Sequence, residues 1–137
     1  MTYNPGQVGW AAIAWQVVTE GGMNWGDDAG ADLHAQGFRS LRIWAAGEPS
    51  SSGTLPKAQF KSGGNTKPRA SYPASYAVSG PPAQLGAHLE EFCLDLTAKD
   101  LSNVVSPFTV VVTKGANPAG AVVIMSDVHY STHPCGH

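Results

Sequence analysis

Half of the 34 positions from 49 to 82 are Gly, Pro or Ser, and this segment limits the folds that the chain can adopt. Apolar residues are sparse in it, and a structureless stretch of this length is unusual inside a compact domain. We therefore expect residues 49–82 to form a long ordered loop, an arm or a lid that packs on its own domain or on a neighbouring subunit. The total of 137 residues allows one domain, residues 1–137, with a sizeable core.

The low charge of the chain excludes several classes of protein. Charged residues make up 13% of the sequence, about half the usual share, and the net charge is −2. The chain is too apolar for a solvated disordered region, and it has no heptads typical of a coiled coil. No basic field attracts it to nucleic acid as a whole. The same composition suits an assembly subunit, so a homo-oligomer is one expected state.

The compartment is predicted from what the sequence lacks. No stretch reaches 18 apolar residues, so we expect no membrane partner. The N-terminus has no basic segment followed by an apolar run, so no signal peptide is seen and the cytoplasm is the default prediction. A domain exported as part of a larger toxin would look the same. Cys93 and Cys135 fit one disulfide or two reduced thiols equally well.

Several apolar runs predict strands. Residues 10–18 read as a strand buried on both faces, with a short helix as the competing interpretation. Residues 38–44 alternate apolar and polar side chains, which predicts a strand with one wet face. The β-branched run 108–113 and the apolar run 121–125 predict two further strands.

One segment has the period of an amphipathic helix. Apolar side chains recur at i, i+4, i+7, i+8 and i+11, on one face of a helix that begins near Pro81-Pro82; they are Leu85, Leu89, Phe92, Cys93 and Leu96. Strands, a long loop, a helix and two more strands together predict an α+β or α/β fold. Its mixed sheet would carry one main amphipathic helix.

Two short motifs carry the one chemical lead. The sequence His88-Leu89-Glu90-Glu91 lies at the start of the expected helix, and Ser131-Thr132-His133-Pro134-Cys135 lies near the end of the chain. On these residues the chain resembles the cytidine-deaminase-like superfamily, including its toxin and base-editing branches. The resemblance implies a zinc-dependent deaminase that acts on a cytosine base or nucleotide, with a nucleoside or single-stranded nucleic acid as substrate. In that chemistry Zn²⁺ activates a water and a Glu moves the proton.

The resemblance assigns roles to particular residues. His88 and Cys135 would be zinc ligands, and Glu90 would be the catalytic proton shuttle. The family's second motif is P-C-x-x-C, whereas this sequence ends at His137, one position before the second Cys. Either the third ligand is absent, or His137 or His133 takes its place, or the chain is a fragment. Substrate-binding residues are not identified.

Other interpretations stay open beside the deaminase. His129, His133, Cys135 and His137 fall within nine residues and have the ligand types of a local zinc site without enzymatic activity. Basic and aromatic residues in the 49–82 segment have the composition of a single-strand binding loop; they are Lys57, Phe60, Lys61, Lys67, Arg69, Tyr72 and Tyr76. The four Trp residues are expected in the core or at an interface. The alternative function is a non-enzymatic structural or binding protein, such as a phage, capsid or filament subunit.

Overall fold

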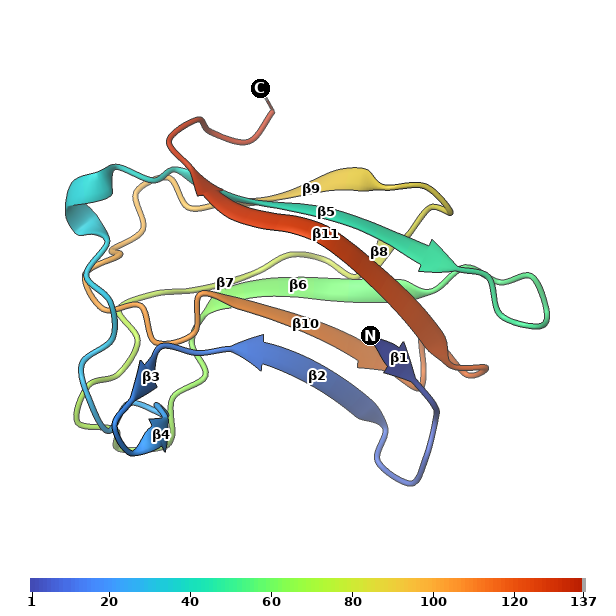
Figure 1. The fold of residues 1–137 in the computed structure, drawn as a ribbon, viewed down its shortest axis with the longest axis horizontal. Coiled ribbons are helices and arrows are strands. Elements are labelled where there is room, and N and C mark those ends of the chain that lie inside the picture. Colours follow the sequence, from blue (N-terminus) through green and yellow to red (C-terminus); the bar gives the residue numbers. More distant parts are fainter. Residues whose placement is uncertain (137) are drawn as a thin grey trace.

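The computed structural model describes residues 1–136, which form two antiparallel sheets packed face to face (Figure 1). The first sheet has the order β1 (Thr2–Tyr3), β11 (Ala121–Ser131), β5 (Ser40–Glu48), β9 (Glu90–Asp95). The second has the order β2 (Trp10–Trp15), β10 (Phe108–Thr113), β6 (Lys57–Gly63), β7 (Ala77–Ser79), and β8 (Ala83–Gln84) pairs with the start of β6. A small hairpin of β3 (Val18–Thr19) and β4 (Gly22–Met23) and a 3-10 helix at His34–Gln36 complete the elements.

The strand order identifies the architecture. Along the chain the main strands pass back and forth between the two sheets, which gives the orders 1-11-5-9 and 2-10-6-7. Every pairing between these strands is antiparallel. This is the jelly-roll form of a β-sandwich, in which eight strands form two Greek keys. The same fold serves shell-forming and ligand-binding proteins, so it does not by itself assign a function.

The expectation of an α+β or α/β fold with one main amphipathic helix is wrong. Residues 1–136 contain eleven strands, and their one helix is three residues long. The segment read as a helix forms β9, where Phe92 and Leu94 point into the sandwich while Glu91 and Cys93 point outward. The side chains of this segment therefore alternate with the period of two of a β-strand, although its apolar residues also fit the helical period of 3.6. Leu85 supported the helical pattern but is buried in the turn before β9.

The structure confirms some of the strand predictions and corrects others. The run 108–113 is confirmed as β10, and 121–125 is the first part of the longer β11. Residues 10–15 do form a strand, but its burial on both faces is wrong because Trp10 and Trp15 are exposed. The segment 38–44 lies largely in β5, whose outer face is not fully wet, since Ser40 and Arg42 are covered there by residues near the C-terminus.

The Gly/Pro/Ser-rich segment is not one long loop. It supplies β6 and β7 to the second sheet. Phe60 of β6 is buried at the centre of the core, with its ring centroid 5.2 Å from that of Phe92 and 6.1 Å from that of Phe108. Gly63 ends β6 with φ of 74°, and a side chain there would strike the carbonyl of Tyr76. The abundant glycine thus allows two chain segments to pass close together.

The core lies between the inner faces of the two sheets. Leu41 and Ile43 of β5 and Val110 of β10 are each at most 1% exposed. They belong to one continuous apolar cluster that reaches from Tyr3 to Val123. Within residues 1–136, no helix has the length and the apolar composition needed to cross a membrane.

Candidate functional site

The strand β2 forms one edge of the second sheet. Within residues 1–136 it pairs with β10 alone, in register from Trp10 opposite Thr113 to Trp15 opposite Phe108. Its other edge leaves a row of backbone N–H and C=O groups without a strand partner in the described part of the chain. No charged residue occurs before Glu20, so the whole strand and both of its flanks are neutral. Proteins usually protect such an edge with charge, Pro or a bulge, and β2 has none of these.

Two side chains of β2 point toward the interior yet remain exposed. Ile13 lies opposite Val110 and Trp15 lies opposite Phe108, so both belong to the inner face of the sheet. The Trp15 and Phe108 ring centroids are 5.0 Å apart. Nevertheless, Ile13 is 41% and Trp15 is 45% exposed, whereas Val110 is fully buried. The sandwich is therefore open on the side of β2.

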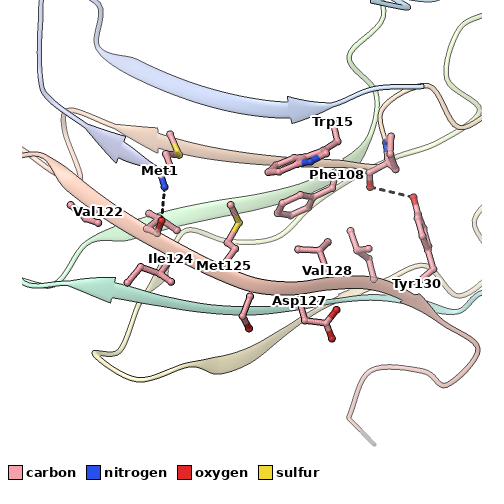
Figure 2. A pocket seen from close by; sticks show the side chains of 13 residues that line it. Met1, Trp15, Phe108, Val122, Ile124, Met125, Asp127, Val128 and Tyr130 are labelled. Carbon is pink, nitrogen blue, oxygen red and sulfur yellow. Dashed lines mark hydrogen bonds between the residues drawn. The ribbon is translucent and has the colours of Figure 1, made fainter. Parts of the chain in front are cut away.

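The opening is a cleft of about 560 Å³ between β11 and the strands β2 and β10 (Figure 2). Its lining is mostly apolar: Met1, Trp15, Leu41, Pro107, Phe108, Val122, Val123, Ile124, Met125, Ser126, Asp127, Val128 and Tyr130. A volume in this range suits a bound ligand or several apolar side chains. The nearby side chains of Asp127 and His129, with Oδ2 and Nδ1 2.9 Å apart, are exposed to solvent on the outer face of β11.

A polar network closes one end of the cleft. The Tyr76 and Tyr130 hydroxyls are 3.0 Å apart, and the Ser62 hydroxyl lies 2.7 Å from that of Tyr76. Both Ser62 and Tyr130 donate to the Pro107 carbonyl, at 2.8 and 3.2 Å. Burial is the main cause that raises the pKa of Tyr76 above its ordinary value, and the neighbouring Tyr130 adds to the effect. These groups satisfy one another, so the network presents no unpaired charge to the cleft.

The raised pKa of Tyr76 predicts a loss of stability in alkali. Above pH 10 an unfolded tyrosine releases its proton while the folded Tyr76 keeps it, so the unfolding free energy falls by about 1.4 kcal/mol per pH unit. Urea titrations between pH 11 and 12, above the ordinary pKa of tyrosine, measure this slope. In Tyr76→Phe the slope should become shallower by that amount, and an unchanged slope would contradict the burial of this hydroxyl.

The residues near the C-terminus fold across the outer face of the first sheet. Cys135 forms a disulfide with Cys93 of β9. The Ser40 hydroxyl donates to the His133 carbonyl at 2.7 Å, and Arg42 donates to the Pro134 carbonyl at 3.0 Å. The Arg42 guanidinium also pairs with the Glu91 carboxylate. This segment thus covers charge that would otherwise be exposed on the sheet.

The residues of the deaminase motif lie apart from one another. The Cys135 sulfur is bonded to Cys93, and His88 and Glu90 are exposed at the start of β9. Along the strand, Glu90 is about 10 Å from Cys93. His133 is exposed, and His137 lies outside the described residues. Among residues 1–136 no three His, Cys, Asp or Glu side chains form a group able to hold a metal, so the zinc site stays a prediction from the sequence.

The predicted single-strand binding loop is also dispersed. Phe60 and Tyr76 are buried in the sandwich and cannot stack on a base. Lys67 forms an ion pair with Asp27. Tyr72 is 49% exposed and is the one aromatic residue of this set on the surface.

The open side of the sandwich was not identified from the sequence. None of the four Trp residues is buried, with exposures from 37% for Trp44 to 57% for Trp10. The available signal was the absence of charge from residue 2 to residue 19 around an apolar strand. A buried strand has the same pattern, so the sequence alone did not distinguish the two. No family model, curated protein or solved structure matches the chain, and the interpretation of the site therefore depends on its geometry.

Proposed function

We propose that this chain is a non-enzymatic subunit of a protein assembly, and that its copies join edge to edge through β2. The observation that carries the proposal is a charge-free apolar strand with an unpaired edge among the described residues. Pairing with another strand gives its backbone groups hydrogen-bond partners and removes Trp10 and Ile13 from water. The jelly-roll fold is compatible with this role, since shell proteins use it.

A second copy of the chain fits this edge well. Two β2 strands related by a two-fold axis run antiparallel and use the same surface on both copies. A register with Ile13 opposite its own copy places Trp15 opposite Ala11 of the second copy on the same face. Large side chains then lie against small ones, and no like charges meet. The second sheets of the two copies, with five strands each, would then become one continuous sheet.

Placing a lysine at the centre of β2 should separate the copies. Ala12 is exposed on the outer face of the strand, away from the cleft, so Ala12→Lys changes the edge without disturbing the core. We expect this variant to weaken self-association at least tenfold, because two lysines would meet near the two-fold axis. Sedimentation equilibrium over a range of concentrations measures the dissociation constants of the variant and the wild type.

Ala87→Lys is the matched control. Ala87 is also exposed, but it lies in the segment before β9, which is a strand of the first sheet. This variant should associate like the wild type. A wild type that stays monomeric at sub-millimolar concentration, or equal dissociation constants for the two lysine variants, would sink the proposal.

The disulfide bears on where the protein works. Disulfides persist in oxidising compartments and are rare in the reducing cytoplasm. We therefore place the working site of this chain outside the cytoplasm, in preference to the default prediction from the N-terminus. Mass spectrometry of the native protein, alkylated without reduction, should find Cys93 and Cys135 unmodified.

A further inference from the structure

Within residues 1–136, the first strand of the jelly roll is very short. β11 has eleven residues, but β1 pairs with just two of them, Ala121 and Val122. Met1 extends the contact by one residue, because its ammonium donates to the Val123 carbonyl and its carbonyl accepts from the Val123 amide, both at 2.8 Å. From Ile124 to Ser131, no other strand of the described chain pairs with this edge of β11.

The cleft follows this unpaired edge. Its lining includes every residue from Val122 to Val128. Neighbouring residues of a strand point to opposite faces of the sheet, and in this part of β11 the alternation is interrupted once, at the register shift between Met125 and Asp127. A cavity that touches seven consecutive residues must therefore run along the backbone edge of the strand. Figure 2 shows β11 passing along the cleft from Val122 to Tyr130, with Trp15 and Phe108 on the opposite wall.

We propose that the cleft is an acceptor site for an extended strand of a second polypeptide, which runs antiparallel to β11 and carries apolar side chains at alternate positions. Its backbone pairs with the free edge of β11 beyond Val123. Its apolar side chains enter between Met125 and Val128 on one wall and Trp15 on the other. This site shares Trp15 with the β2 edge, but it does not depend on self-association through β2.

The chemistry of the cleft selects this occupant. A small apolar molecule would fill the volume but leave the backbone edge of β11 without a hydrogen-bond partner, whereas a strand satisfies both. The polar groups at the end of the cleft, Tyr130 and Pro107, already bond each other. Asp127 pairs with His129 on the outer face. The inward-facing residues of the occupant are therefore uncharged.

The contacts of β1 fix the register of the added strand. Tyr3 and Met1 lie on the inner face of the sheet, opposite Ala121 and Val123, and Thr2 is exposed. In a strand that continues β1 in the upstream direction, the second, fourth and sixth residues before Met1 face the cleft. The other three positions face solvent. A shift by one residue exchanges the two sets.

The test joins such a strand to the full chain. Behind an initiator Met, one variant carries Val-Thr-Val-Thr-Val-Thr before Met1, which points the three valines into the cleft. The other carries Thr-Val-Thr-Val-Thr-Val, which points the three threonines inward. Composition and side-chain shape are the same in both, and buried threonine hydroxyls would lack partners. We expect the first variant to melt about 5–10 °C above the second.

A free peptide then tests binding in trans. A dye-labelled Val-Thr-Val-Thr-Val-Thr peptide with two lysines at its C-terminal end is titrated into the unextended chain by fluorescence anisotropy. It should bind, and the first extended variant should bind it at least tenfold more weakly. Repeating both measurements in Ala12→Lys separates this site from β2 pairing. Equal melting temperatures, no binding by the unextended chain, or binding that persists in the first variant would overturn the proposal.

Discussion

Replacement of Phe60 by Ala should lower the unfolding free energy by about 3–5 kcal/mol. The side chain is 3% exposed, and its ring packs against both Phe92 of the first sheet and Phe108 of the second. Its loss would remove apolar contacts from both sheets and leave a cavity that a closely packed core fills poorly. Urea denaturation monitored by circular dichroism measures the change.

Tyr72→Ala provides the control for this prediction. Tyr72 is an aromatic residue of the same Gly/Pro/Ser-rich segment, but its side chain is half exposed. The control should cost less than about 0.5 kcal/mol, because no core contact is lost. If Phe60→Ala were as mild as Tyr72→Ala, the segment would not contribute a core strand and this part of the fold would be refuted.

Removal of the disulfide should have the second-largest effect. Cys93 and Cys135 are separated by 42 residues, and a cross-link that closes a loop of this size stabilises a protein by about 2–4 kcal/mol. The double variant Cys93→Ser/Cys135→Ser should lose stability in this range. The cause is the larger freedom of the unfolded chain, together with weaker contacts of the terminal segment with Ser40 and Arg42.

A reducing agent serves as an internal check on the cysteine pair. Under reduction the denaturation midpoint of the wild type should fall close to that of the double variant, and the double variant itself should not respond. If the denaturation midpoint of the wild type did not change under reduction, the two sulfurs would not stabilise the fold through a bond.

An element could be predicted from the sequence where its residue pattern fitted one type of secondary structure and no other. Residues 108–113 form a strand as expected, because a β-branched run has no good helical alternative. Residues 90–95 satisfied both periods, and the longer helical match misled because Leu85 and Leu89 belong to the preceding turn. These residues form a strand because they pair with β5. This pairing joins residues that are far apart in the sequence, so no local pattern contains it.

The candidate site was harder to predict for a similar reason. The low charge suggested interfaces, but the cleft depends on how far β1 extends along β11, which is a property of tertiary structure. In the sequence, the two motifs around His88 and Cys135 have the residue types of a zinc ligand set. The disulfide joins Cys135 to Cys93 instead, five residues beyond His88. Short motifs separated by 47 positions did not fix their spatial relation.

The disulfide also determines how the sandwich carries mechanical load. Tension on the C-terminal end would otherwise peel β11 from β5, one pair at a time, beginning at Ser131. With Cys135 tied to Cys93, the force passes into β9 before it reaches the end of β11. The strand that borders the cleft is thus shielded from tension at its own C-terminal end. A subunit built in this way can be pulled through that end while β11 keeps its register.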